Sequence, residues 1–244
     1  MRQYLNALSM TQSMFCRIPW PFQIWDEDAR GKMLLFLPLV GLEIGGLWAL
    51  SWSACRWLGL APVLRGLILC VIPFWLTGFI HLDGYMDVTD AVGSCRALDK
   101  RRAILKDSHV GAFAVIGSVL LMLAQFAFGS CVERGGQVLV LIPVVSRCCS
   151  ALAVTILPPM STSQYAGRKV SKGHIVVFCV MLTISLALGF FLWGRWAWSL
   201  IGTLVGYGLA LRKSYRSLEG MNGDISGYSL TMGELAGLGV LAFL

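Results

Sequence analysis

Acidic residues are scarce in this chain of 244 residues, which contains 13 Asp and Glu against 20 Lys and Arg. Charged residues of both signs make up only 14% of the sequence, whereas hydrophobic residues make up 57%. Soluble domains carry about 25% charged residues, and a mean hydropathy of +0.71 lies well above the range of soluble proteins. The composition therefore excludes a soluble protein and indicates an integral membrane protein.

Several sequence patterns are also missing. The eight cysteines and three histidines form no C-x-x-C pair and no Cys/His ligand spacing, so we expect the cysteines to be small buried hydrophobes rather than zinc ligands. The first thirty residues lack the continuous apolar run of a signal peptide, so the N-terminus is expected to stay in the cytoplasm. The basic clusters have no interleaved aromatic residues, which argues against a nucleic-acid partner.

Seven apolar runs are long enough, or nearly so, to cross a hydrocarbon layer of about 30 Å. We expect Pro73 to interrupt the second of them. Residues 3–15 have the pattern of a short amphipathic helix, and residues 1–32 are predicted to lie at the membrane surface. The predicted fold is an all-α integral membrane protein, a single polytopic helical bundle (residues 1–244) of about seven transmembrane helices with an N-terminal interfacial helix. The runs are 33–53, 61–80, 110–132, 138–157, 174–193, 196–211 and 228–244.

The distribution of positive charge predicts the orientation in the membrane. With the N-terminus inside, the inside segments hold fifteen Lys and Arg and the outside segments hold four. Lys and Arg concentrate in cytoplasmic loops, so this orientation is favoured. We therefore expect a multi-pass protein of the cell inner membrane, with the polar segment 81–109 and the active site facing the cytoplasm and with the C-terminus outside.

Three of the few acids, Asp83, Asp87 and Asp90, fall within eight positions of one another. On a helix, steps of four and three residues place them within roughly 60° of arc. Carboxylates that close repel each other, and a divalent cation, most simply Mg²⁺ together with a substrate phosphate, would neutralise the repulsion. The alternative is a solvated acidic helix end.

Further charged residues accompany this cluster. Lys106, Asp107 and Ser108 follow with several glycines, which is typical of a phosphate site, while Lys100–Arg102 can equally be a topogenic cluster that binds anionic lipid. Asp224 falls in a second loop on the same predicted side, where the alternative is a plain turn. Three ionisable residues lie inside predicted spans and either pair with one another or have a function: Glu43, Arg147 and Glu234.

The order and spacing of His81, Asp83, Gly84, Asp87 and Asp90, followed by Lys106-Asp107-Ser108-x-x-Gly111, resemble the signature of the cobalamin 5′-phosphate synthases, also called adenosylcobinamide-GDP ribazoletransferases. Matches elsewhere include Arg17-Ile-Pro19, Phe36-Leu-Pro38, Ser146-Arg147, Gly223-Asp224 and Gly233-Glu234. The chain departs from the family pattern at Ala91 and His109. It also departs in the segment 158–173, where only Tyr165, Ala166 and Arg168 are retained, in altered context.

The resemblance implies transfer of the adenosylcobinamide phosphoryl group from adenosylcobinamide-GDP to α-ribazole 5′-phosphate or α-ribazole, with release of GMP. The implied cofactor is Mg²⁺, and the implied partners are these two substrates and the lipid bilayer; a homo-oligomer is left open. The predicted metal ligands are Asp83, Asp87, Asp90 and Asp224, and the predicted catalytic acids are Asp83, Asp87, Asp90 and Asp107. The predicted substrate-binding residues are His81, Gly84, Arg102, Lys106, Ser108, Arg147 and Asp224.

Two other functions fit parts of the sequence. The CDP-alcohol phosphotransferases run the same kind of reaction with a CMP leaving group, but their motif needs an Ala-Arg pair that is missing after Asp83-Gly84. A cation transporter can also contain carboxylates within its spans. Against a transporter, the acids gather near one membrane surface.

Overall fold

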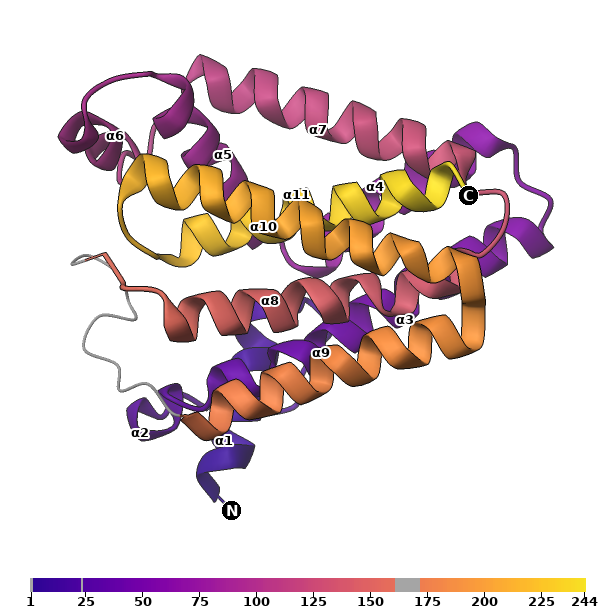
Figure 1. Cartoon of the computed structure of the whole chain (residues 1–244), viewed down its shortest axis with the longest axis horizontal. Coiled ribbons are helices and arrows are strands. Elements are labelled where there is room, and N and C mark those ends of the chain that lie inside the picture. Colours follow the sequence, from indigo (N-terminus) through magenta and orange to yellow (C-terminus); the bar gives the residue numbers. More distant parts are fainter. Residues whose placement is uncertain (1, 23, 161–171) are drawn as a thin grey trace.

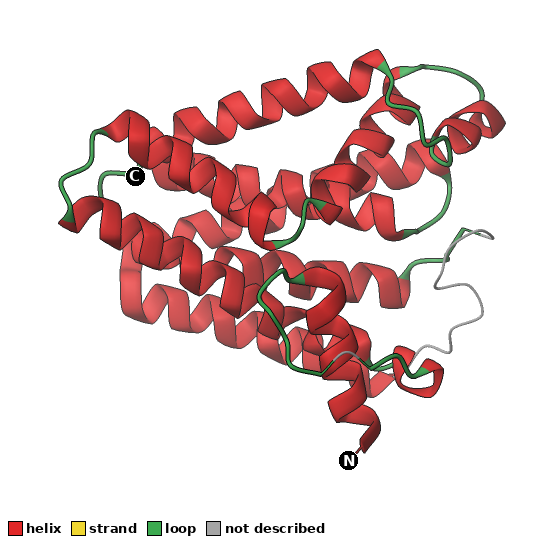
Figure 2. Cartoon of the chain, turned by 180° about the vertical axis from the view of Figure 1, so that it is seen from behind, coloured by secondary structure: helices red, strands yellow, loops and turns green. Residues whose placement is uncertain are grey.

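The computed structural model describes residues 2–22, 24–160 and 172–244, and every regular element within these ranges is a helix (Figures 1 and 2). Tyr165, Ala166 and Arg168 lie outside the described residues. The elements are α1 (Arg2–Phe15), α2 (Glu27–Arg30), η1 (Met33–Phe36), α3 (Leu37–Trp57), α4 (Pro62–Leu76), α5 (Ile80–Gly93), α6 (Leu98–Ile104), α7 (Ala112–Cys131), η2 (Gly136–Val140), α8 (Ile142–Ile156), α9 (Lys172–Trp193), η3 (Gly194–Ala197), α10 (Trp198–Leu218) and α11 (Gly223–Ala242).

The C-terminal helix α11 is the central element of the bundle and packs against α10, α5, α8 and α7. Small residues allow the closest of these contacts, because a Cβ atom on Gly237 would lie 2.1 Å from the Thr203 hydroxyl of α10. The peripheral helices α7 and α9 instead expose large apolar side chains, such as Leu120, Leu123 and Phe191. Exposed apolar surface of this extent is expected where a helix faces lipid.

Four described segments are long and apolar enough to cross a membrane, namely Met33–Trp57, Ala112–Cys131, Gly136–Ile156 and Lys172–Leu218. A fifth is obtained if α4 and α5 form one broken span. Lys172–Leu218 contains 47 residues, which as one straight helix would measure about 70 Å, more than twice the hydrocarbon thickness. It comprises α9, η3 and α10, and the chain reverses direction at η3 (Figure 1). The predicted count of seven spans is not confirmed.

The sharpest bend in the chain separates α4 from α5, whose axes differ by 93°. The prediction that Pro73 interrupts this region is wrong, because α4 continues through Pro73 to Leu76. The Thr77 hydroxyl donates to the carbonyl oxygens of Pro73 and Phe74, at 3.0 Å each, and so satisfies groups at the end of the helix. The break lies at Gly78 and Phe79, which both have positive φ.

The predicted helix over residues 3–15 is confirmed as α1, but its environment differs from the expected one. Tyr4 and Leu5 are exposed, whereas Ser9, Thr11 and Gln12 are buried against the rest of the protein. The Gln12 side-chain amide donates to the carboxylate of Glu43 in α3. α1 is therefore packed into the protein with these polar residues beside the buried Ala7, Met10 and Phe15, and its first turn faces outward.

The cysteines bear out the predicted burial only in part. Five of them are buried and none of the eight forms a disulfide. Cys95, Cys131 and Cys179 are exposed. Because the latter two lie on the outward-facing helices α7 and α9, their exposure has the same cause as that of the neighbouring apolar side chains.

Candidate active site

The three clustered acids lie on one helix, as predicted. α5 extends over Ile80–Gly93 and carries Asp83, Asp87 and Asp90, and it packs between α7 and α11. Its orientation is held by Tyr85, whose ring stacks on Tyr228 of α11 at 5.4 Å and whose hydroxyl donates to the Gly117 carbonyl of α7. The acids are thus fixed within the bundle. The connection from α5 to α7 begins only after Gly93 and contains the short helix α6.

A fourth acid, Asp224, joins this group from the first turn of α11. Asn222 caps this helix by accepting from the backbone N–H of Ile225, and its side-chain amide donates to the Asp224 carboxylate at 2.6 Å. The carboxylates of Asp83, Asp224 and Asp90 all act electrostatically on Asp87. None of the ion pairs among the described residues includes any of the four. The structure therefore brings together the predicted metal ligands as an uncompensated negative group.

Gly84 is the residue that lets Asp224 approach α5. A Cβ atom at this position would lie 2.9 Å from the Asp224 Cα atom, closer than carbon atoms pack. Because α5 is also held by α7, an added methyl group would push the first turn of α11 away from the acids. Gly84, predicted to bind substrate, thus has a structural role in assembling the site.

We expect Gly84→Ala to lower thermal stability by about 1–3 kcal/mol, as overpacking does in a close-packed interior, and to lower transfer activity with it. Gly46→Ala is the matched control, because it also adds a methyl group within a helix and nothing lies within 4 Å of that position. Thermal unfolding and turnover of both variants in detergent are the measurements. Equal behaviour of the two variants would contradict the role given to Gly84.

Asp90 differs from the other acids because it faces the start of α7. A Cβ atom on Gly111 would lie about 2.0–2.4 Å from the Asp90 carboxyl group, and the backbone N–H of Ala114 points at this carboxylate from 3.4 Å. A carboxylate at a helix N-terminus is stabilised by the unpaired N–H groups and the helix dipole. Asp90 therefore connects α5 to α7 in addition to its predicted role.

The side chains as they stand do not form a metal site by themselves. No group of three or more His, Cys, Asp or Glu among the described residues is arranged closely enough to hold a metal ion. Mg²⁺, however, is usually bound by one or two carboxylates together with waters and substrate phosphates. The all-oxygen donors and the absence of a cationic partner within the described ranges fit such a site, in which substrate completes the coordination.

The predicted residues between α5 and α7 are less closely tied to the acids. Lys106, Asp107 and Ser108 are exposed, and Asp107 is hydrogen-bonded to the backbone and ring of His109. This hydrogen bond from His109 lowers the pKa of Asp107. Asp107 is not among the acids that act on Asp87. The structure thus leaves Asp107 on the connection and does not place it in the carboxylate group.

Arg102 is engaged with backbone groups. Its Nε and Nη2 atoms donate to the carbonyl oxygens of Leu218 and Glu219, at 2.9 and 2.7 Å, which caps the end of α10 with a positive charge. The hydrogen bonds hold α6 against the α10–α11 connection. Arg102 therefore supports the loop that carries Asp224.

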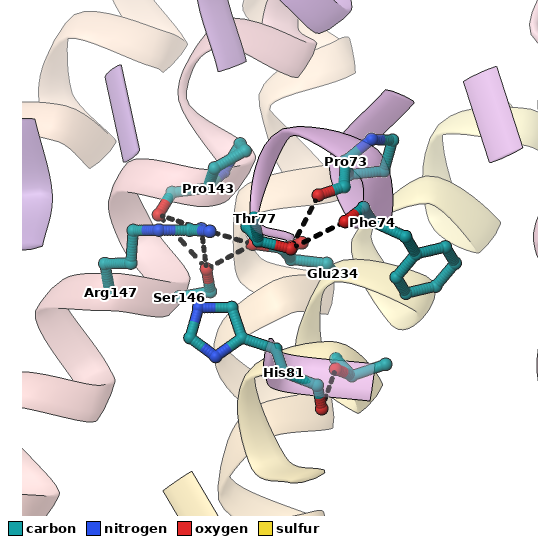
Figure 3. A network of polar contacts seen from close by, with 9 residues as sticks. Pro73, Phe74, Thr77, His81, Pro143, Ser146, Arg147 and Glu234 are labelled. Carbon is teal, nitrogen blue, oxygen red and sulfur yellow. Dashed lines mark hydrogen bonds and ion pairs between the residues drawn. The ribbon is translucent and has the colours of Figure 1, made fainter. Parts of the chain in front are cut away.

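A buried polar network includes Arg147 and Glu234 (Figure 3). Arg147 Nη1 lies 2.6 Å from the Glu234 carboxylate, which also accepts from Ser146 Oγ at 2.8 Å. The alternative that these two ionisable residues pair with each other is therefore confirmed. Arg147 Nε and Nη2 have no hydrogen-bond partner within the described residues.

His81 lies beside this network (Figure 3). Its ring stacks on Phe15 of α1 with centroids 6.0 Å apart, and its buried Nε2 atom has no partner among the described residues. The backbone carbonyl of His81 accepts from Thr231 of α11 at 3.4 Å. His81 is thus placed where α1, α5 and α11 meet.

A cavity of about 120 Å³ opens next to His81, Asp83 and Asp224 and extends among α1, α5, α8 and α11. Ser150 and Ser226, which also line it, lie 2.5 Å apart through their hydroxyl oxygens. Sequence reasoning missed both serines. Ser146 and Ser150 are spaced by four in a mostly apolar helix, so that they share a face, and this signal could have indicated a polar lining.

The sequence also matches a known protein family. A model of the family described as Cobalamin-5-phosphate synthase matches residues 7–242. The chain belongs to the cobalamin-5-phosphate synthase family. The resemblance seen in the Asp83–Asp90 segment and the match over almost the whole chain therefore agree.

Relatives within the cobalamin-5-phosphate synthase family match the chain from end to end. The adenosylcobinamide-GDP ribazoletransferase of Clostridium botulinum strain Alaska E43 is 35% identical over 250 residues, covering 98% of this chain and 97% of that protein. The adenosylcobinamide-GDP ribazoletransferase of Clostridium perfringens strain 13 is 34% identical over 251 residues, covering 100% of both. No solved structure was found to match this chain.

Proposed function

We propose that this protein transfers the adenosylcobinamide phosphoryl group from adenosylcobinamide-GDP to α-ribazole 5′-phosphate or α-ribazole, releasing GMP and forming adenosylcobalamin 5′-phosphate in the former case. The observation that carries the proposal is the match of residues 7–242 to the family, with relatives of that name aligned over the whole chain. The reaction is a late step of cobalamin biosynthesis. The group of four acids beside a cavity supports a site for a diphosphate substrate.

The chemistry required is attack of a ribose hydroxyl on the cobinamide-side phosphorus, with the bond to the GMP oxygen broken. When bound, Mg²⁺ would neutralise the diphosphate and the charge that develops on the leaving oxygen. Asp83 and Asp87, with Asp224 next to them, are the residues proposed to hold it. Asp83 is exposed and lines the cavity, so it is also placed to contact the attacking hydroxyl.

Orientation in the membrane is proposed from the ends of the bundle. In Figure 1, α6 and the α10–α11 connection lie at one end, while η3 and the C-terminus lie at the other. The first end carries Lys100, Arg101, Arg102 and Lys106 on and after α6. By the positive-inside rule this end, with the acids, faces the cytoplasm in a single-domain protein of the inner membrane.

A reporter fused after Leu244 is expected to be outside the cytoplasm. The reason is that the C-terminus lies at the bundle end opposite the basic α6 (Figure 1). Paired fusions of an enzyme active only in the cytoplasm and one active only outside it would measure this, with a fusion after Arg101 as the cytoplasmic control. A cytoplasmic signal after Leu244 would contradict the proposed orientation.

Purified protein in detergent is expected to release GMP from adenosylcobinamide-GDP when α-ribazole 5′-phosphate and Mg²⁺ are both present, and to stop when EDTA removes the metal. No second compartment exists in detergent, so a cation transporter would show no activity there. Omission of α-ribazole 5′-phosphate is the control for simple hydrolysis. Absence of GMP release in the complete mixture would contradict the proposed function.

A further inference from the structure

The cavity beside the acids continues into an open depression of about 680 Å³ under the N-terminal segment. The two share Met14, Ile80 and Asp83 in their linings, so they form one path that passes Asp83. Arg17 lines the outer part, beside the break between α4 and α5. From its open end inward, the path therefore presents first the guanidinium of Arg17, then the carboxylate of Asp83, and finally the cavity between the helices.

The inner part of the path combines apolar walls with polar groups, namely two carboxylates, the His81 ring and two hydroxyls. Ser150 and Ser226 supply the hydroxyls, and the Tyr207 hydroxyl lies beside them, buried and without a well-formed hydrogen bond within the described residues. A cavity of about 150 Å³ holds a benzene ring, so this smaller cavity of about 120 Å³ takes one edge of an aromatic ring system whose remainder lies in the open depression. The apolar walls come from Met14, Phe15, Leu34, Leu37, Ile80 and Leu230.

The outer part offers a site for an anion. Arg17 is exposed. Its backbone is held by its N–H, which donates to the Leu76 carbonyl at 2.7 Å, and its guanidinium lies 5.7 Å from the centre of the Trp75 ring. An arginine held in this way presents several N–H donors that match a phosphate. Asp83 lies between Arg17 and the inner cavity on the shared path.

We infer that this path binds the second substrate lengthwise, with the 5′-phosphate of the ribazole nucleotide at Arg17, the ribose at Asp83 and one edge of the aromatic base in the cavity. The inference rests on the proposed function. It places the attacking ribose hydroxyl next to the carboxylates that are proposed to hold the metal. It also makes the cavity wall the part of the protein that selects the base.

The lining of the cavity suits one edge of this base. Its polar groups include the hydroxyls of Ser150 and Ser226 and the His81 ring, whose buried Nε2 atom has no partner among the described residues. A benzimidazole-type base has an apolar edge and one free ring nitrogen, so the edge can contact the apolar walls while the nitrogen pairs with one of these groups.

Three variants of the full-length protein in detergent test the binding mode through the KM of each substrate. Leu37→Phe narrows the cavity and is expected to raise the KM for α-ribazole 5′-phosphate by about tenfold, and less for an analogue with a smaller base. Ser150→Ala removes one hydroxyl and is expected to raise the same KM by roughly threefold. The KM for adenosylcobinamide-GDP is expected to stay within about twofold in both.

Arg17→Gln tests the phosphate end. It is expected to raise the KM for α-ribazole 5′-phosphate by about tenfold and to leave that for α-ribazole, which has no phosphate, within about twofold. Leu121→Phe is the matched control for Leu37→Phe, because Leu121 is buried in α7 and does not line the cavity. If Leu37→Phe does not fold, Ser150→Ala and Arg17→Gln still test the proposed binding mode.

Each outcome separates the inference from the proposed function. Wild-type protein that releases no GMP would contradict the function itself. Active wild-type protein with an unchanged KM for the nucleotide in Ser150→Ala and Arg17→Gln would overturn only the binding mode. A rise in the KM for adenosylcobinamide-GDP alone would likewise overturn it and assign the cavity to the first substrate.

Discussion

Asp83→Asn and Asp87→Asn are each expected to lower the rate of transfer about a thousandfold, or about 4 kcal/mol in the activation barrier. The amide keeps the size of the side chain but removes the charge that would bind Mg²⁺ and the lone pairs of a carboxylate. Both residues lie on α5 in a group of acids with no cationic partner among the described residues. The measurement is GMP release at saturating substrates, with Mg²⁺ titrated for each variant.

Stability provides the internal check on this prediction. Because each variant removes one member of a group of repelling carboxylates, the unfolding temperature is expected to stay equal or to rise while activity falls. Asp99→Asn is the matched control. It changes an exposed acid on the neighbouring helix α6 and is expected to alter activity by no more than about twofold. Full activity in both Asp83→Asn and Asp87→Asn would exclude the carboxylate group as the catalytic site.

Asp90→Asn is expected to have a mixed effect. Like its neighbours, Asp90 adds negative charge at the site, so transfer should again decrease by several kcal/mol in barrier. Unlike them, it faces the start of α7, and the loss of its charge should also destabilise the protein by about 0.5–1 kcal/mol. A decrease in both turnover and unfolding temperature is therefore the expected result, measured in the same assays.

Arg147→Met is expected to destabilise the protein by about 3–5 kcal/mol, because it leaves the Glu234 carboxylate buried without its partner. The pair is 2.6 Å apart, and the Arg147 side chain is only 1% exposed. The double variant Arg147→Met/Glu234→Leu removes both charges and is expected to recover at least half of that loss. Thermal unfolding in detergent of the wild type, both single variants and the double variant completes the cycle.

Arg56→Met is the control for the buried pair. Arg56 and Glu133 form an exposed ion pair at 3.1 Å, and such pairs contribute about 0–1 kcal/mol. A similar small effect for Arg147→Met would contradict the structural importance of the buried pair. A double variant that regains stability but not transfer would assign the Arg147–Glu234 pair a role in the reaction as well as in stability.

Local patterns in the sequence predicted the features that depend on neighbouring residues. The helix over residues 3–15 follows from the spacing of its apolar residues, and the shared helix of Asp83, Asp87 and Asp90 follows from steps of four and three. Proline lacks an N–H donor, so the sequence predicts the break before α5 at Pro73. The break lies instead at Gly78 and Phe79, and hydrogen bonds from the Thr77 hydroxyl stabilise the last turn of α4, which contains Pro73.

By itself, the sequence determined that the chain is a helical membrane protein with a cluster of acids on one helix, because hydropathy and helical spacing are properties of adjacent residues. Only the tertiary structure decided which groups from other helices surround these acids. It placed Asp224 against Gly84, turned Asp90 toward α7, paired Arg147 with Glu234, and opened a cavity lined by Ser150 and Ser226 beside Asp83. These contacts join residues from different helices, and their formation depends on how close the backbones can pack, which no single segment of sequence specifies.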